Sequence, residues 1–123
     1  MRYRRIRQRP LRPSSIRRSG CAHVIDGVQV KRLDTHYSII SQVTRRLAWD
    51  TGKDTVVINT GFFKDQDQFY SRSNIVDMQP LIESAKEHGF NAGGKKDVIG
   101  AIIPKAETES FLLETLEYIK KNR

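Results

Sequence analysis

Two short segments combine the side chains and backbone that bind phosphate in proteins. The residues concerned are Ser71, Arg72, Ser73, Gly93, Gly94, Lys95 and Lys96. A planar guanidinium group matches the geometry of a phosphate, and a lysine adds a point charge. Glycines let another backbone or a ligand approach closely and leave their N–H groups free to donate. These residues therefore indicate a phosphate-binding site, and a plain turn between two elements is the alternative interpretation of the glycines.

Known nucleotide-binding loops do not account for the glycine segment. Residues 89–95 fit the spacing GxxxxGK, but Lys96 follows where a phosphate-binding loop needs serine or threonine for magnesium. The segment also follows an expected helix and precedes an expected strand, which is the reverse of such a loop. These two departures argue against ATP or GTP binding. No GxGxxG follows a strand, so a dinucleotide site has no support either.

Metal and catalytic chemistry have little support in the sequence. Cys21 is the single cysteine, and the histidines His23, His36 and His88 are scattered without a second ligand at metal spacing. No Asp-His-His triplet or aspartate-rich cluster able to hold two metal ions occurs. We therefore expect no catalytic residue, no metal site and no cofactor in this chain.

The charge of +8 lies entirely in the first residues. Residues 1–18 hold eight arginines and no acid, whereas residues 19–123 hold fourteen Lys and Arg against fourteen Asp and Glu. A segment of one sign with few apolar residues cannot bury enough surface to offset its ordering entropy. We expect residues 1–19 to be a disordered basic tail and residues 20–123 to form one domain. Candidate nucleic-acid contacts in the tail are Arg2, Arg4, Arg5, Arg7 and Arg9.

Two other interpretations of this tail stay open, namely a solvated tail without a partner and an upstream region that is not native protein sequence. No stretch approaches the roughly 18 apolar residues of a membrane helix. No apolar run follows the first arginines, so a secretory signal is not expected. A single cysteine fits a reducing compartment, and we expect a cytoplasmic protein with no membrane partner.

Hydrophobic periodicity and turn residues predict the order β-β-α-β-β-α-β-α. Strands are expected at 22–25, 28–33, 54–63, 68–76 and 97–104, and helices at 36–52, 78–88 and 107–121. An Asp-Gly pair at 26–27 indicates a hairpin turn between the first two strands. The fold class is therefore α/β (α+β), with a mixed sheet of about five strands covered by three helices.

The spacing of apolar residues also predicts which helix faces are buried. The expected inward residues are Ile40, Val43 and Leu47, then Met78, Leu81, Ile82 and Ala85, and finally Leu112, Leu116 and Ile119. Trp49 and most tyrosines and phenylalanines are expected in the core. Tyr70 and Phe90 are the candidates for stacking on a nucleobase.

The segments SRS at 71–73 and AGGKKDVIG at 92–100 together resemble the signature of the DHH-associated domain. This is the C-terminal domain of DHH phosphoesterases such as RecJ-like exonucleases and oligoribonucleases. That family has an arginine-serine strand end, a helix, a GGGH motif and, shortly afterwards, A-A-G. Residues 92–95 correspond to GGGH, and residues 98–100 correspond to A-A-G. The resemblance is sharpest over residues 71–103.

The resemblance implies that this domain holds a nucleic-acid substrate while a separate DHH domain binds manganese and performs hydrolysis. Arg72 and Ser73 would contact phosphate or sugar, and the backbone of Gly93 and Gly94 would approach the nucleotide. Lys95 stands where the family has histidine. A lysine can anchor a phosphate as a fixed charge, but it cannot exchange a proton near neutral pH.

The leading hypothesis is a module that binds single-stranded nucleic acid or a short oligonucleotide and is not an enzyme by itself. A first alternative is the C-terminal part of a manganese-dependent DHH phosphoesterase or exonuclease. Its catalytic domain would then lie on a missing segment or on a partner chain. A second alternative is a protein-interaction module in a replication or repair complex.

Overall fold

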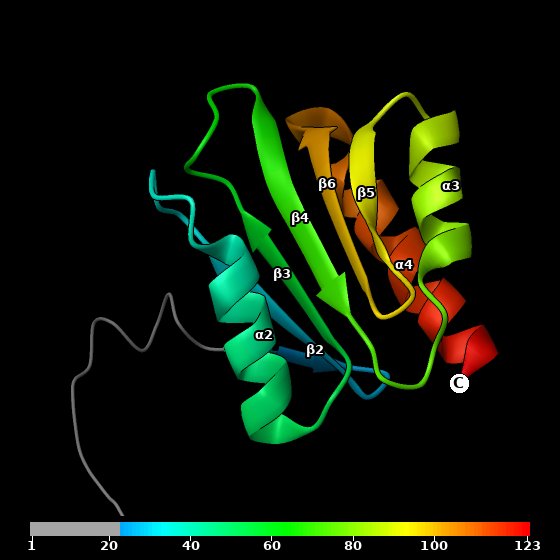
Figure 1. The fold of residues 1–123 in the computed structure, drawn as a ribbon. Coiled ribbons are helices and arrows are strands. Elements are labelled where there is room, and N and C mark those ends of the chain that lie inside the picture. The colour runs from blue at the N-terminus through cyan, green and yellow to red at the C-terminus, as the bar shows by residue number, and fades with distance from the viewer. Residues whose placement is uncertain (1–22) are drawn as a thin grey trace, which may run out of the picture.

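A computed structural model describes residues 23–123, which form one mixed sheet of six strands with helices on both faces (Figure 1). The strands are β1 (His23–Ile25), β2 (Val28–Leu33), β3 (Thr55–Asn59), β4 (Gln66–Arg72), β5 (Asn91–Lys95) and β6 (Val98–Pro104). The helices are α2 (Ile40–Thr51), α3 (Gln79–Glu87), α4 (Thr108–Asn122) and the short 3₁₀ helix η1 (Lys105–Glu107). The predicted fold class is confirmed. The expected basic tail, with its candidate arginines, lies outside the described residues.

The strands follow the order β1-β2-β3-β4-β6-β5. β2 and β3 are parallel and are connected through α2, whereas the other neighbouring strands are antiparallel. The predicted hairpin between β1 and β2 is confirmed, because Asp26 and Gly27 have φ values of 53° and 81°. These positive values are those of the tight turn that suits the twist of a hairpin. α2 ends at Thr51, one residue before the expected end, and Gly52 caps it in the left-handed conformation with a φ of 69°.

The sixth strand, β5, is the one that the sequence analysis missed. It contains Gly93 and Gly94, which were expected to form a turn, whereas the turn between β5 and β6 consists of Lys96 and Asp97. Glycine disfavours strands, but pairing with a neighbouring strand outweighs that local preference. Here β5 forms a five-residue ladder along the buried strand β6.

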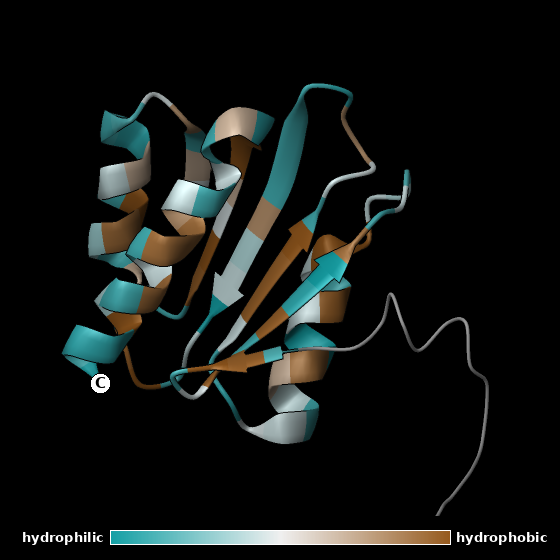
Figure 2. Cartoon of the chain, turned by 180° about the vertical axis from the view of Figure 1, so that it is seen from behind, coloured by the Kyte–Doolittle hydropathy of each residue, from teal (hydrophilic) through white to brown (hydrophobic). Residues whose placement is uncertain are grey.

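The main core lies between the sheet and the two helices α3 and α4. Phe111 of α4 meets Phe69 of β4 and Phe90 in edge-to-face contacts, with ring centroids 5.0 and 5.6 Å apart. The inward faces predicted for these two helices are confirmed, because every residue expected there is buried. Figure 2 shows β3 and β6 as mainly hydrophobic and β4 as mainly hydrophilic. That difference indicates that β4 has a face turned towards solvent.

The predicted buried face of α2 is confirmed at Ile40, whereas at the two later positions it is wrong by one residue. Ile40, Thr44 and Ala48 are buried against the sheet, whereas Val43 and Leu47 are only half-buried. The hydroxyl of Thr44 donates to the carbonyl of Ile40 at 2.7 Å, so its burial leaves no polar group unpaired. A helix that rests on small residues lies close to the sheet, and its larger apolar residues then point to the sides.

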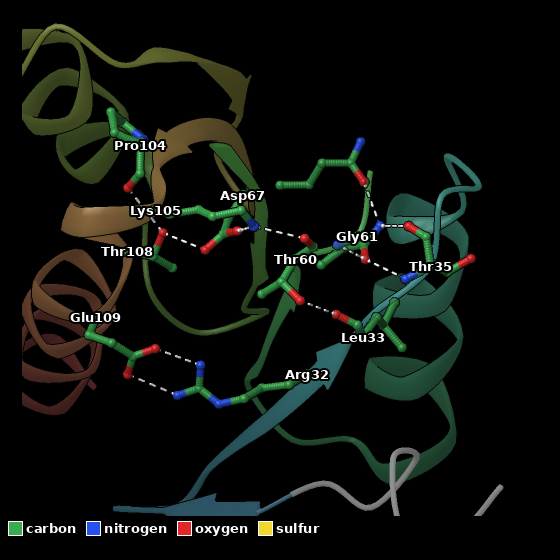
Figure 3. A network of polar contacts seen from close by, with 12 residues as sticks. Arg32, Leu33, Thr35, Thr60, Gly61, Asp67, Pro104, Lys105, Thr108 and Glu109 are labelled. Carbon is green, nitrogen blue, oxygen red and sulfur yellow. Dashed lines mark hydrogen bonds and ion pairs between the residues drawn. The ribbon is translucent and has the colours of Figure 1, made fainter. Parts of the chain in front are cut away.

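A polar network holds the loops at one end of the sheet (Figure 3). The buried carboxylate of Asp67 accepts hydrogen bonds from Lys105 Nζ at 2.6 Å and from Thr108 Oγ1 at 2.7 Å. Lys105 also donates to the carbonyl of Thr60 at 2.7 Å, and Arg32 pairs with Glu109 at 2.6 Å. These contacts connect the loop after β3 to the start of α4. They lie at the end of β4 opposite Arg72.

None of the helices among residues 23–123 is long and apolar enough to cross a membrane.

Candidate nucleic-acid interface

One half of the sheet is uncovered on the face that carries α2. Figure 1 shows α2 on the near face, where it packs on β3 and β4, whereas α3 and α4 lie behind β5 and β6. Side chains alternate between the two faces of each strand, and the register of β4, β6 and β5 places one set of residues on this uncovered face. They are Gln68, Tyr70, Arg72, Asn91, Gly93, Lys95, Val98, Gly100 and Ile102. A shallow groove of about 440 Å³, open to solvent, is lined by all of these residues except Arg72 and Lys95, which lie beyond its end.

The floor of this groove is open backbone at Gly93, and the ring of Tyr70 lies against Gly100 beside it. Tyr70, Gly100 and Gly93 lie side by side on three neighbouring strands. A Cβ at Gly93 would meet no atom within 4 Å, so this position opens into the groove. A Cβ at Gly100 would lie 2.8 Å from the ring of Tyr70, which shows that the ring rests against this glycine. The groove can therefore admit a ligand close to the backbone, beside an aromatic wall.

The two adjacent glycines have different roles. Gly94 has a φ of 151°, and a Cβ there would lie 2.1 Å from the carbonyl oxygen of Val98. No other residue fits that position without a rearrangement of the hairpin. Gly93 has no such restraint, because its Cβ would meet open space. The hairpin therefore needs Gly94, whereas the packing around Gly93 leaves its lack of a side chain unexplained.

The predicted cations lie at one end of the uncovered face. Arg72 is paired in register with Val98, and Val98 is paired with Lys95. Since neighbouring strands are about 4.8 Å apart, the Cα atoms of Arg72 and Lys95 lie roughly 10 Å apart. Lys95 and Lys96 are exposed, and neither forms an ion pair among the described residues. A phosphate group placed between them would therefore be within reach of both Arg72 and Lys95.

Asp97 connects the two predicted segments, a role that the sequence did not indicate. Arg72 Nη2 lies 3.3 Å from Asp97 Oδ2, so this carboxylate is the ion-pair partner of the arginine. The backbone N–H of Ser73 donates to the carbonyl of Asp97 at 3.0 Å. The N–H of Met78 donates to the carbonyl of Lys96 at 2.7 Å. The structure thus holds the SRS strand end against the turn that follows the glycines.

The two serines do not open onto the groove. Ser71 is fully buried on the core side of β4, and its hydroxyl has no hydrogen-bond partner. Ser73 is also buried, and its Oγ accepts hydrogen bonds from the N–H groups of Ile75 and Val76 at 3.1 and 3.0 Å. That arrangement stabilises the turn that leads into α3. Arg72 is the member of the SRS segment that reaches the uncovered face.

Two predictions about aromatic residues are wrong. Phe90 is buried and packs against Phe111, so it cannot stack on a base. Trp49 was expected in the core, but it is 82% exposed. The reason is the position of α2, which buries Ala48 against the sheet and turns the next residue towards solvent. Tyr70 remains the aromatic candidate within the groove.

A sequence model of the DHHA1 domain matches residues 25–122. The chain belongs to the DHHA1 domain family. This is the DHH-associated domain that the SRS and AGGKK segments resemble, so the family prediction is confirmed. No curated protein sequence matches the chain.

Two solved structures share the DHHA1 fold with this chain. One is the pGpG-specific phosphodiesterase PggH from Vibrio cholerae, with a TM-score of 0.60 and 15% identity. The match covers 84% of this chain and 36% of PggH. The other is RecJ from Thermus thermophilus in complex with Mg²⁺, with a TM-score of 0.50 and 15% identity. That match covers 73% of this chain and 14% of RecJ. The chain therefore spans about a third and a seventh of these proteins.

The described part of the DHHA1 domain has no arrangement of ligands for a metal centre. Among residues 23–123, no group of three or more His, Cys, Asp or Glu side chains could hold a metal ion. These residues do not fit the manganese site that the resemblance assigns to a separate DHH domain. The ring of His88, at the end of α3, instead forms a hydrogen bond with the carbonyl of Ser84 at 2.7 Å.

Proposed function

We propose that this DHHA1 domain binds single-stranded nucleic acid or a short oligonucleotide on the uncovered half of its sheet. The observation that carries the proposal is the glycine-floored groove, which has Arg72 and Lys95 at the same end. Backbone without side chains allows close approach, and the cations favour a phosphate. Tyr70 offers a ring beside the floor, and stacking on aromatic rings is independent of base sequence.

The proposal gives a separate role to every predicted residue of the two segments except Ser71, which is buried on the core side of β4. Arg72 keeps N–H donors beyond the one that faces Asp97, so it can hold a phosphate while its position is restrained. Lys95 and Lys96 supply fixed charge next to it. Gly93 admits the ligand, and Gly94 maintains the hairpin. Ser73 acts through the turn that it stabilises, which keeps Arg72 beside Asp97.

The direct test is a binding titration of the full chain with labelled oligonucleotides. Fluorescence anisotropy with oligo(dT), oligo(rU) and pGpG covers DNA, RNA and the dinucleotide for which PggH is described as specific. Arg72→Ala should weaken binding by roughly 1–3 kcal/mol, the range for loss of a charge-assisted hydrogen bond. Lys120→Ala, on an exposed part of α4, is the charge-matched control and should change little. Unchanged affinity of Arg72→Ala would refute the proposed site.

A second candidate function is the substrate-holding part of a longer DHH phosphoesterase. The observation in its favour is the limited share of PggH and RecJ that the chain covers. In that case a DHH domain on another segment or chain would supply manganese and the hydrolytic residues. The single cysteine fits a cytoplasmic setting for this activity.

Hydrolysis assays separate the two candidates. The purified chain alone should not cleave oligo(dT), short RNA or pGpG with manganese present, because its described residues lack a metal centre. Addition of a separately produced DHH catalytic domain should then produce cleavage that Arg72→Ala reduces. Cleavage by the chain alone that is lost on point mutation of its own residues would refute this division of roles.

A further inference from the structure

The side of α2 next to the uncovered sheet carries an exposed tryptophan. Trp49 is 82% exposed, although tryptophan is on average one of the more buried residues. It is also the only tryptophan in the chain. Arg45 precedes it by four residues, so the two side chains are neighbours on one side of the helix. The packing of α2 on the sheet, through Ala48, does not use either of them.

These two residues border a second hollow beside the glycine groove. The hollow has a volume of about 350 Å³ and is lined by Arg45, Ala48, Trp49, Gly52, Arg72 and Asn74. That volume lies within the range of about 300–1,000 Å³ that small-molecule sites occupy. Arg72 and Tyr70 are two residues apart on the same face of β4, so the hollow and the groove are about 7 Å apart along that strand.

We propose that this hollow binds one nucleotide of a single strand whose neighbouring nucleotide occupies the glycine groove. The base would stack on Trp49, and the phosphate would lie between Arg45 and Arg72. The side-chain amide of Asn74 can donate and accept at the edge of a base or at a sugar. The inference rests on the proposed function, because Arg72 contributes to both places.

The charges favour a nucleic acid over an apolar protein surface as the occupant. No carboxylate lines the hollow among the described residues, and Arg45 forms no ion pair there. The adjacent Arg46 differs, since it pairs with Asp50 at 3.2 Å on the other side of α2. An exposed aromatic ring flanked by arginines is a combination that binds single strands without sequence preference.

The fluorescence of Trp49 provides the test, because no other tryptophan contributes to the signal. The full chain is titrated with oligo(dT) and with an oligonucleotide of equal length that carries abasic sites. Oligo(dT) should quench the emission in parallel with binding measured by anisotropy. The abasic strand should bind about tenfold more weakly, within the range for loss of one stacked base, and should not quench.

Substitutions on α2 test whether these side chains contribute to oligonucleotide binding. Trp49→Ala should weaken oligo(dT) binding about tenfold, whereas Trp49→Phe should retain most of the affinity because a smaller ring still stacks. Arg45→Ala should weaken binding more than Arg46→Ala, which is the control of equal charge on the same helix. The three side chains concerned are exposed, so thermal unfolding should be nearly unchanged and should exclude a folding defect.

The outcomes also separate this inference from the proposed function. If Gly93→Val abolishes binding but Trp49→Ala does not, and the emission stays constant, the nucleotide site on α2 is wrong and the groove remains. If no oligonucleotide binds at all, both are wrong. If the emission responds to an added DHH catalytic domain and not to oligonucleotides, the surface docks protein and this inference is also overturned.

Discussion

The sharpest prediction concerns Gly93, where stability and binding should change in opposite directions. A Cβ at this position meets nothing within 4 Å, and the φ value lies outside the left-handed region. Replacement by valine therefore adds no clash to the folded chain. Glycine in a strand costs about 0.5–1 kcal/mol relative to alanine, and valine favours strands further. Gly93→Val should raise the free energy of unfolding by about 1 kcal/mol.

That gain corresponds to a rise of about 4–8 °C in the midpoint of thermal unfolding for a domain of this size. The same side chain would stand over the groove floor beside Gly100 and Tyr70. We expect the affinity for oligo(dT) to fall at least about tenfold, the cost of excluding roughly one stacked base. Gly93→Ala should give an intermediate loss of affinity, because its side chain is smaller.

The assay combines thermal melts followed by circular dichroism with anisotropy titrations of the same protein samples. Gly94→Val is the contrasting variant and should lower the melting midpoint, because its Cβ would clash with the carbonyl of Val98. His23→Val, on the opposite edge strand β1, should leave binding unchanged. Wild-type affinity in a stable Gly93→Val protein would show that no ligand approaches this backbone, and the proposed site would fail.

Three further predictions follow from single contacts. Asp97→Asn should raise oligonucleotide affinity about two- to fivefold in anisotropy titrations, because it removes a carboxylate that competes for Arg72; a loss of affinity would contradict this. Lys95→Ala should reduce the slope of log affinity against log salt by about 0.7, the value for one lost phosphate contact on a single strand, and an unchanged slope would exclude that contact. The pKa of His88 is raised from 6.5, first by its hydrogen bond to the Ser84 carbonyl and then by nearby glutamates. Protonated His88 therefore stabilises the folded state, fully below the unfolded pKa and progressively less as pH rises through the folded pKa. His88→Gln should lower the melting midpoint more at pH 5.5 than at pH 8. Equal decreases of the midpoint at the two pH values would contradict this linkage.

Local sequence patterns were sufficient for most of the fold. The faces of α3 and α4 were predicted correctly because each helix packs on one continuous layer, which produces apolar residues at spacings of three and four. The turn at Asp26 and Gly27 was also predicted, since few other pairs adopt positive φ at both positions. The combined SRS and AGGKK segments identified the family that the match over residues 25–122 confirms.

Elements whose environment depends on distant partners were harder to predict. β5 contains two glycines and lacks a strand pattern, so only its pairing with β6 makes it a strand. The buried face of α2 was wrong at its two later positions because Thr44 and Ala48 are small enough to approach the sheet, a preference that hydrophobic periodicity does not reveal. The exposure of Trp49 follows from that position and was missed for the same reason.

The sequence by itself determined the type of every main helix and strand except β5, the family, and the residue types able to bind phosphate. Each of these depends on neighbours a few positions apart or on a linear motif. Only the tertiary structure decided that Gly93 lies beside Gly100, that Lys95 lies in register with Arg72, and that Asp97 is the partner of this arginine. Strand register is set by hydrogen bonds and side-chain packing between segments far apart in the chain, so a shift of one residue would turn every side chain to the opposite face.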